Sequence, residues 1–400
     1  MRKVFLVIST SLLIVISIVF FSTVSSFVQL LSKQEEDNTA LNSFLDVNGT
    51  DSSIEPKLKT TTIVSGLYNP WDIAFLNKDI FFYPEKIGAM HMHNIATGED
   101  VVIAKPNISL MGEGGLLGMA VDNDFSNNHY LYTCMNINTD DKLSIVVARW
   151  TVSQDLKSTE GRKDIITDIP ANTQGGERHS GCRVRVATTG EIWVGTGDTA
   201  NGTVPQDPKS LGGKVLRVDK DGKGVTGNLG DPFDPRIFNY GHRNIQGLYL
   251  FPAPINGVYG ITAEHGPDKD DEVNLIKQGN YGWDPIPGYN ELKVPMTDLV
   301  KFPDAIPAIW SSGTPAMATS GITMIKGNQW KAWNGAVIIA LLKDMQLRLQ
   351  TYNNWKIERD EKVLDGYGRI RIVVQGPDGD LFFGTDNGGA LDVIVRVTPE

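Results

Sequence analysis

Thr189-Gly190-Glu191-Ile192-Trp193-Val194-Gly195 is one copy of a short pattern that recurs along the whole chain. A turn rich in Gly, Asn or Asp precedes a run of β-branched and aromatic residues, which is typical of a tight turn leading into a β-strand. Five further copies begin at Asn77, Asn127, Asn256, Asn334 and Asp378. No stretch keeps a period of 3.6 residues, so we expect little helix.

Six like units between residues 61 and 400 predict an all-β fold: a six-bladed β-propeller of four-stranded antiparallel blades. A two-sheet sandwich is the alternative, but radial repetition fits six similar units better. If each repeated strand is the inner strand of its blade, it ends near the central axis. Polar residues that come after these strands should then converge on one face of the propeller. Such residues include Lys86, Asp198, His265, Lys343 and Asp386.

The first 60 residues have a different character. Residues 4–31 carry no charge and are mostly apolar or small, and Arg2 and Lys3 precede them. Such a run is long enough to span a bilayer, and its positive N-terminal flank directs the downstream chain out of the cytoplasm. We therefore predict a signal anchor or a signal peptide over residues 1–32, and both remain open. Residues 33–60 are polar, acidic and poor in aromatics, which indicates a flexible linker before the propeller domain at 61–400.

Composition narrows the partners and the compartment. The net charge is −10 and the chain has no Lys/Arg run, so nucleic acid is not an expected partner. Three glycosylation sequons, at Asn48, Asn107 and Asn201, are compatible with an extracellular or periplasm-like location, with a possible membrane tether. Cys134 and Cys182 could pair in an oxidising compartment, and neither has the spacing of a metal ligand.

The densest polar stretch is residues 240–283. It contains four short clusters between apolar runs: Tyr240-Gly241-His242-Arg243-Asn244, Glu264-His265-Gly266-Pro267, Asp270-Asp271-Glu272-Val273-Asn274 and Asn280-Tyr281-Gly282-Trp283. Polar clusters at the ends of strands are where a rigid scaffold presents chemistry. A turn and a solvated loop would be the ordinary structural explanation of any one cluster, but less so of all four.

These clusters and several others resemble the soluble pyrroloquinoline-quinone-dependent aldose sugar dehydrogenases, the glucose/sorbosone dehydrogenase family. The matching stretches keep the family's order from about residue 61 to the C-terminus. Besides the clusters above they are Pro70-Trp71-Asp72-Ile73-Ala74-Phe75, Gly114-Gly115-Leu116-Leu117-Gly118, His179-Ser180-Gly181, Leu342-Lys343, Gly368-Arg369-Ile370-Arg371 and Gly376-Pro377-Asp378-Gly379. The family fold is a six-bladed propeller, in agreement with the repeats.

The resemblance implies an exported enzyme that oxidises the anomeric hydroxyl of an aldose sugar to a lactone. Its cofactor would be pyrroloquinoline quinone (PQQ), which carries three carboxylates, with a calcium ion and an external electron acceptor. A planar trianion needs fixed cations, and Arg243, Lys343, Arg369 and Arg371 would supply four. Arg369 and Arg371 would share one face of a strand, because alternate residues do.

Further site residues come from the same resemblance. His179 is the expected general base, since a neutral imidazole can accept the hydroxyl proton as hydride leaves the sugar. His242 and His265 resemble family positions that pack or line the pocket. Asn244 would hold the cofactor through its amide. Glu113 would also contact the cofactor, although many relatives have Gln there, and its charge would weaken binding unless it is protonated or paired with a cation such as Lys86.

Calcium prefers oxygen ligands. By analogy with the family, the main-chain carbonyls of Gly266 and Pro267 would hold one ion beside the cofactor. Asp271 and Glu272 are candidates for a second, structural calcium, against the alternative of a solvated loop. Arg178 replaces the acidic neighbour of the base in glucose-specialised members, which leaves the preferred sugar open.

Two other functions remain as alternatives. One is a non-catalytic cell-surface binding module, since some propellers of this type trap ligands. The other is a calcium-dependent propeller lactonase, which would centre its ion on side-chain carboxylates. The combination of His179 with four cations and Gly266-Pro267 favours the quinone-dependent dehydrogenase, because neither alternative needs it.

Overall fold

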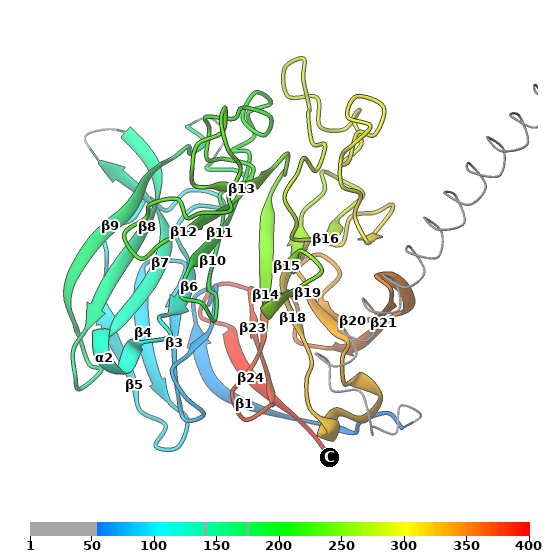
Figure 1. Cartoon of the computed structure of the whole chain (residues 1–400). Helices are drawn as coiled ribbons and strands as arrows, with labels where there is room; N and C mark the ends of the chain where they lie inside the picture. Colours follow the sequence, from blue (N-terminus) through cyan, green and yellow to red (C-terminus); the bar gives the residue numbers. More distant parts are fainter. Residues whose placement is uncertain (1–53, 140–141, 174–175) are drawn as a thin grey trace, which may run out of the picture.

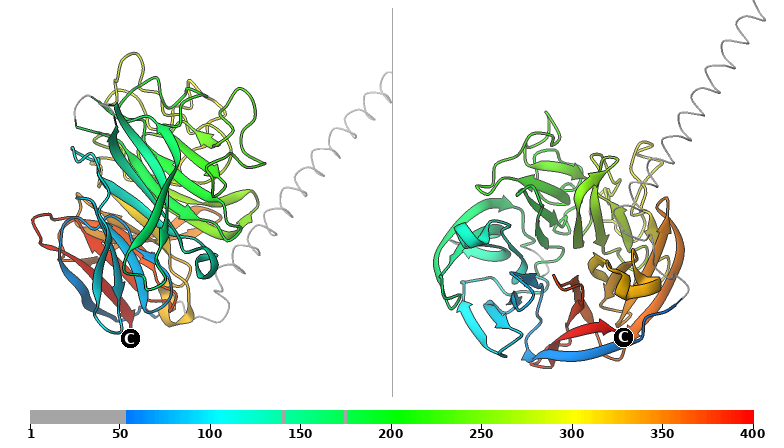
Figure 2. Two further views of the ribbon diagram at one scale, coloured as in Figure 1. Left: turned by 90° about the vertical axis from the view of Figure 1, so that its left-hand side faces the viewer. Right: turned by 60° about the horizontal axis from the view of Figure 1, so that its bottom comes forward.

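The structure, a computed structural model, describes residues 54–139, 142–173 and 176–400. It contains six four-stranded antiparallel sheets arranged as a ring around a central axis (Figures 1 and 2). The prediction of an all-β, six-bladed propeller is therefore confirmed. The predicted anchor or signal peptide at 1–32, the linker up to residue 53 and the sequon at Asn48 lie outside the described residues.

The blades succeed one another along the chain, and each is numbered here in that order. Blade 1 contains β2 (Ala74–Phe75), β3 (Ile80–Glu85), β4 (Ala89–Asn94) and β5 (Asp100–Ala104). Blade 2 contains β6 (Leu116–Val121), β7 (Tyr130–Thr139), β8 (Lys142–Val152) and β9 (Thr159–Ile169). Blade 3 contains β10 (Gly181–Val186), β11 (Ile192–Thr196), β12 (Lys214–Val218) and β13 (Ile237–Tyr240).

Blades 4 to 6 complete the ring. Blade 4 contains β14 (Ile245–Ile255), β15 (Val258–Glu264), β16 (Glu272–Leu275) and β17 (Trp310–Ser311). Blade 5 contains β18 (Thr319–Met324), β19 (Val337–Leu341), β20 (Gln346–Asn353) and β21 (Lys356–Asp365). Blade 6 contains β22 (Ile370–Gln375), β23 (Leu381–Thr385) and β24 (Asp392–Pro399), with β1 (Leu58–Leu67) as its outer strand.

Strand β1 closes the ring by joining the two ends of the domain. It pairs antiparallel with β24, from Leu58 opposite Pro399 to Leu67 opposite Asp392, as the adjacent blue and red strands of Figure 2 show. This pairing holds the two ends of the domain together, so the ring does not open between its first and last blades. Because β1 begins at Leu58, the propeller starts before the predicted boundary at residue 61.

Helix is scarce, as the sequence predicts. The described residues contain the short helix α2 (Phe125–Asn128) and the 3₁₀ helix η1 (Asn328–Trp333). Neither of these helices is long and apolar enough to cross a membrane.

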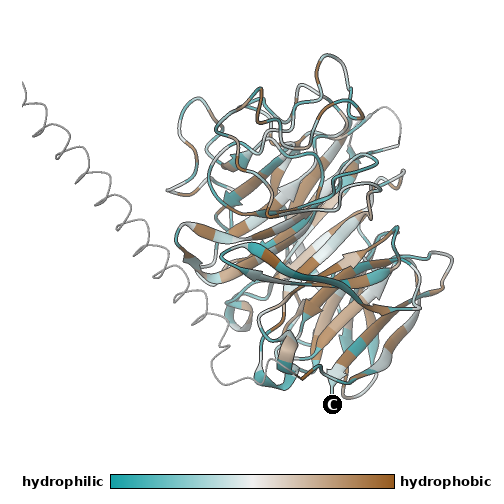
Figure 3. Ribbon diagram, turned by 90° about the vertical axis from the view of Figure 1, so that its right-hand side faces the viewer, coloured by the Kyte–Doolittle hydropathy of each residue, from teal (hydrophilic) through white to brown (hydrophobic). Residues whose placement is uncertain are grey.

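The repeated turn-strand units form the second strand of every blade, namely β3, β7, β11, β15, β19 and β23. The expectation that they are the inner strands is therefore wrong. The first strands lie innermost, since β2, β6, β10, β14, β18 and β22 contact the first strands of neighbouring blades. The physical reason lies in burial: every residue of β11, β19 and β23 is buried. Strands covered on both faces read as continuous apolar runs, which makes them the most visible in a sequence. Figure 3 shows hydrophobic residues along the strands of the blades.

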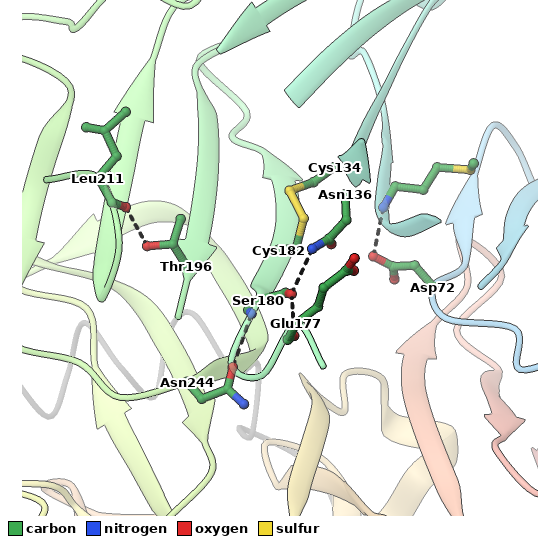
Figure 4. The surroundings of a disulfide bond; sticks show 11 residues. Asp72, Cys134, Asn136, Glu177, Ser180, Cys182, Thr196, Leu211 and Asn244 are labelled. Atoms are coloured by element: carbon green, nitrogen blue, oxygen red, sulfur yellow. Dashed lines mark hydrogen bonds between the residues drawn. A yellow bond between two sulfur atoms is a disulfide. The ribbon is translucent and has the colours of Figure 1, made fainter. Parts of the chain in front are cut away.

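The disulfide between Cys134 on β7 and Cys182 on β10 joins blades 2 and 3 (Figure 4). The possible pairing of these two cysteines is thus confirmed.

Candidate active site

One rim of the propeller gathers the predicted site residues. In each blade the first strand runs away from this rim and the antiparallel second strand returns to it, so residues before the first and after the second strand lie at the same end. Glu113, His179, Arg243 and Arg369 precede the first strands β6, β10, β14 and β22. Lys86, Asp198, His265, Lys343 and Asp386 come after second strands. Convergence at one rim thus occurs, although the repeated strands are not the innermost ones.

His179 is held in one ring orientation by a buried carboxylate. Its Nδ1 lies 2.8 Å from Oδ1 of Asp198, and both side chains are almost fully buried. The other oxygen of Asp198 accepts hydrogen bonds from Nε1 of Trp283, at 2.7 Å, and from the hydroxyl of Tyr289, at 2.9 Å. Because a carboxylate only accepts hydrogen bonds, Nδ1 of His179 carries the proton and Nε2 keeps its lone pair. This arrangement suits a general base.

The backbone around His179 adopts an unusual conformation. The φ angles of Glu177, His179 and Cys182 are 52°, 56° and 75°, in the left-handed region of backbone conformation that residues other than glycine rarely adopt. Such strain persists only where the surrounding contacts fix the chain. The amide of His179 donates to Oε2 of Glu113 at 2.9 Å, and the amide of Gly181 donates to Oδ1 of Asn244 at 3.1 Å. Figure 4 shows Glu177, Ser180 and Asn244 in the surroundings of the disulfide.

Arg243 is the most buried of the predicted cations. Its Nη1 donates to the carbonyl oxygens of His265 and Gly266, each at 2.9 Å, and its Nη2 donates to Glu291 at 2.6 Å. Burial lowers the pKa of Arg243, but Asp198, Tyr289 and Glu291 outweigh this and raise it above its usual value. The buried Nε of Arg243 has no hydrogen-bond partner within the described residues.

The charges of the predicted arginines act on His265. Burial, together with the cations Arg243, Arg371 and Arg369 and the ring of His179, lowers the pKa of His265 well below its usual value. His265 therefore remains neutral. Its Nε2 is buried and, among the described residues, has no hydrogen-bond partner.

A continuous chain of contacts links Arg371 to the base. Nη1 of Arg371 donates to Gln246 at 3.2 Å, and Nε2 of Gln246 lies 3.2 Å from Oδ1 of Asn244. Nδ2 of Asn244 donates in turn to Oε2 of Glu113 at 3.3 Å, the oxygen that accepts from the His179 amide. Residues from blades 2, 3, 4 and 6 thus form one site.

Arg369 and Lys343 lie at the more open side of the site. The side chain of Arg369 is 42% exposed, its Nη1 contacts the carbonyl of Leu342 at 3.4 Å, and its Nη2 lies 3.8 Å from Asp386. Lys343 comes directly after Leu342 and is exposed. Arg371 is less exposed and pairs with Asp386 through its Nε at 2.9 Å. Although burial opposes it, this pairing lowers the pKa of Asp386.

Besides its predicted contact with the cofactor, Glu113 has hydrogen-bond partners within the protein. Its carboxylate anchors both the His179 amide and Asn244. Burial and the charge of Arg371 lower the pKa of Lys86, whereas Asp386 and Glu113 act in the opposite direction. Nζ of Lys86 donates to the carbonyl oxygen of Gly112, the residue directly before Glu113, so a cation lies near this carboxylate.

The donor set fits a flat trianionic cofactor. The rim presents Arg243, Arg369, Arg371 and Lys343, and cationic forks of this kind bind carboxylates. Two buried polar atoms, Nε of Arg243 and Nε2 of His265, also lack partners that a ligand could supply. Buried polar atoms without partners are rare and call for an explanation.

The predicted ligands of the two calcium ions lie in different surroundings. The carbonyl of Gly266 faces the site, as its contact with Arg243 shows, and a carbonyl oxygen has a second lone pair. Asp271 and Glu272 do not form a solvated loop, because both are buried. The oxygens of Asp271 accept from the amides of Gly266, Met317 and Ala318.

The carboxylate of Glu272 also has hydrogen-bond partners within the protein. It is bonded to Asn274 at 3.2 Å and to Thr297 at 3.2 Å, and burial next to Glu264 raises its pKa to about 8. A second calcium at Asp271 and Glu272 therefore stays a prediction. No group of three or more His, Cys, Asp or Glu side chains in the described part of the chain is arranged to hold a metal.

Sequence reasoning did not assign several residues of this site. Asp198 was recognisable as a polar residue after a strand, but its partnership with His179 depends on the ring geometry. Tyr289 and Glu291 come from the long loop between β16 and β17, but they lie after its Asn280-Tyr281-Gly282-Trp283 cluster, where the sequence has no recognisable pattern. His242 is buried and bonded to Glu264 and Asn239, as expected of a packing residue.

Similar proteins agree with this geometry. An uncharacterised protein of Synechocystis sp. is 31% identical over 366 residues, which cover 84% of this chain and 86% of that protein. The aldose sugar dehydrogenase of Escherichia coli is 27% identical over 350 residues, covering 83% and 91%. The PQQ-bound aldose sugar dehydrogenase of Streptomyces coelicolor superposes with a TM-score of 0.70 at 27% identity, covering 87% of this chain and all of that one.

Fold, site and relatives together define the class of the chain: a propeller oxidoreductase of the sugar dehydrogenase type. The family model for Glucose / Sorbosone dehydrogenase matches residues 67–394, nearly the entire propeller. The chain belongs to the glucose/sorbosone dehydrogenase family.

Proposed function

We propose that this protein is a PQQ-dependent aldose dehydrogenase that oxidises the anomeric hydroxyl of a sugar to a lactone. The observation that carries the proposal is the buried His179–Asp198 pair, which lies at the same rim as three arginines and a lysine. Quinoprotein relatives and a PQQ-bound structural neighbour support the choice of cofactor.

In this proposal the cofactor, when bound, accepts hydride from C1 of the sugar. The residues of the chain handle the proton and the charges. Nε2 of His179 accepts the proton of the anomeric hydroxyl, and Asp198 stabilises the resulting imidazolium through Nδ1. Arg243, Arg369, Arg371 and Lys343 hold the cofactor carboxylates and oxygens, while Asn244 positions it through its amide. Trp283 and Tyr289 keep Asp198 in place by donating to its second oxygen.

We also propose one calcium ion in the loaded site. The main-chain carbonyls of Gly266 and Pro267 would hold it, and the cofactor would complete its ligands. The ion would polarise the quinone oxygen that gains charge. An electron acceptor outside the chain would then reoxidise the cofactor.

We propose that the protein is located outside the cytoplasm and that the N-terminal segment is a signal anchor or a signal peptide. The Cys134–Cys182 disulfide supports this location, because such bonds persist mainly in oxidising compartments.

The test is reconstitution. Purified protein is loaded with PQQ and Ca²⁺, and dye reduction is measured with a panel of aldoses. We expect sugar-dependent reduction that His179→Ala abolishes while an absorbance titration shows that the cofactor still binds. A matched control is His129→Ala, which changes a histidine beside helix α2, outside the described site. Failure of the protein to bind PQQ at all would refute the proposal.

A further inference from the structure

A cavity of about 570 Å³ lies beside the base, because two of its lining residues, Arg178 and Tyr289, contact His179. Arg178, Thr199 and Tyr289 form the wall next to His179 and Asp198. The polar side chains that line the cavity are hydroxyls, amides and one guanidinium: Asn172, Thr173, Arg178, Asn201, Thr203 and Tyr289. The lining contains no carboxylate among the described residues. A cavity of this size and chemistry suits a small polar ligand.

Arg178 brings positive charge to the point where the substrate must react. Its Nη2 lies 3.4 Å from Nε2 of His179, the expected proton acceptor. Its side chain is 42% exposed, so much of the guanidinium faces the cavity. Whatever lies against Nε2 therefore also lies within reach of this cation.

Arg178 shares its carboxylate partner with a second arginine. Glu291 is the carboxylate that pairs with Arg178, at 2.9 Å, but it also pairs with Arg243, at 2.6 Å. One carboxylate thus serves two guanidinium groups. A guanidinium has five N–H donors in a planar fork that matches a carboxylate or a phosphate.

Arg178 is the more accessible of the two guanidinium groups that share Glu291. Its side chain is 42% exposed, whereas that of Arg243 is 4% exposed. A neutral sugar would give Arg178 no partner that water does not already provide.

We propose that the cavity beside Arg178 is a subsite for an anionic group, and that the preferred substrates are aldoses that carry a carboxylate or a phosphate. This inference rests on the function proposed above and names its substrate class. The anionic group contacts the guanidinium of Arg178, while the anomeric hydroxyl lies against Nε2 of His179.

The experiment compares matched sugars on the loaded protein. The value of kcat/KM is measured for D-glucose, D-glucuronate and D-glucose 6-phosphate, and for the pair D-galactose and D-galacturonate. We expect each charged sugar of the preferred kind to exceed its neutral counterpart by about tenfold or more, the range of one charge-assisted hydrogen bond. The uronate and the phosphate arms show which anion the subsite takes. This preference should shrink as ionic strength rises.

Three variants assign the preference to one side chain. Arg178→Gln should reduce the ratio of charged to neutral kcat/KM by about tenfold or more, and Arg178→Lys should retain most of it. The matched control is Arg162→Gln, which removes the same charge from the outer strand β9, where Arg162 pairs with Asp164. This control should keep the wild-type ratio.

Several outcomes would overturn the inference. One is a wild-type preference for neutral sugars, and another is a ratio that Arg178→Gln leaves unchanged. A weaker PQQ affinity of Arg178→Gln in an absorbance titration would make Arg178 a cofactor ligand instead. Oxidation of neutral sugars alone would refute the subsite but leave the proposed function intact. If no sugar is oxidised, calorimetric titration with glucuronate still decides: equal binding by wild type and Arg178→Gln refutes the subsite.

Discussion

Replacement of Asp198 by Asn tests the proposed base most directly. Asp198 accepts four hydrogen bonds, from Nδ1 of His179 at 2.8 Å, the amide of Ala200 at 2.8 Å, Nε1 of Trp283 at 2.7 Å and the hydroxyl of Tyr289 at 2.9 Å. An asparagine has one oxygen and one NH₂ group, so it cannot serve both pairs of donors. Either orientation leaves one buried N–H group facing another donor, at Ala200 or at Trp283.

Both orientations impair the base. If the NH₂ group faces His179, Nδ1 must accept, and Nε2 carries the proton that it should be free to take. If the oxygen faces His179, the tautomer is kept, but the imidazolium loses its buried negative partner. General base catalysis contributes about 10²- to 10⁴-fold, so we expect kcat to fall by that factor, or about 3–5 kcal/mol.

The assay is steady-state dye reduction by the PQQ-loaded variant, with the cofactor affinity measured in parallel. We expect Asp198→Asn to lose kcat, while its PQQ affinity stays near the wild-type value, because Asp198 touches the base and not the cofactor cations. His179→Ala gives the lower limit. If Asp198→Asn retains kcat within about threefold of wild type while His179→Ala is inactive, Asp198 has no part in the proton transfer, and the reasoning is refuted.

Three further predictions concern the surroundings of the site. Replacing Cys134 and Cys182 together by Ser should reduce the free energy of unfolding by about 4 kcal/mol, given the separation of 48 residues, and denaturant titration measures this loss. The same variant should have a lower kcat, because Cys182 lies three positions from the base. An unchanged kcat in steady-state kinetics would exclude this second effect. Burial lowers the pKa of His91, but Asp100 and Glu85 outweigh burial and raise this pKa from 6.5 to about 9. The stability advantage of wild type over His91→Gln should therefore be about 3 kcal/mol below pH 6.5 and should disappear as the pH rises through about 9. A constant difference in Tm across this pH range would contradict the prediction. Glu113→Gln removes one negative charge beside a trianionic ligand and should tighten PQQ binding by about threefold to tenfold, whereas weaker binding in an absorbance titration would show that the carboxylate is needed.

The fold could be predicted because its signal is local. Each second strand is buried on both faces, and its apolar run after a Gly- or Asn-containing turn can be read without knowledge of the rest of the chain. Convergence of polar residues at one rim could be inferred from the repeats. The innermost strands were not recognised as such because they lack the Gly- or Asn-containing turn that precedes each second strand.

The site was only partly predictable, because hydrogen-bond partners depend on ring geometry. The separation between Asp198 and Trp283 is 85 residues, and between Asp198 and Tyr289 it is 91. No local pattern in the sequence connects such residues. The solvated loop expected around Asp271 was wrong for a similar reason. A run of acidic residues is ordinarily solvated, but here the carboxylate of Asp271 accepts hydrogen bonds from three main-chain amides that are distant in the sequence or form a tight turn with it.

The loop that carries the proposed base is fixed by neighbours from three blades at once. Glu113 and Cys134 belong to blade 2 and its approach, Asp198 comes after a strand of blade 3, and Asn244 directly precedes blade 4. The left-handed backbone at His179 can be maintained only while all of these contacts hold together. Because each contact crosses or borders a blade boundary, small shifts between blades act on the imidazole before they disrupt any sheet. The activity of the proposed base should therefore be lost under milder denaturing conditions than the β-structure.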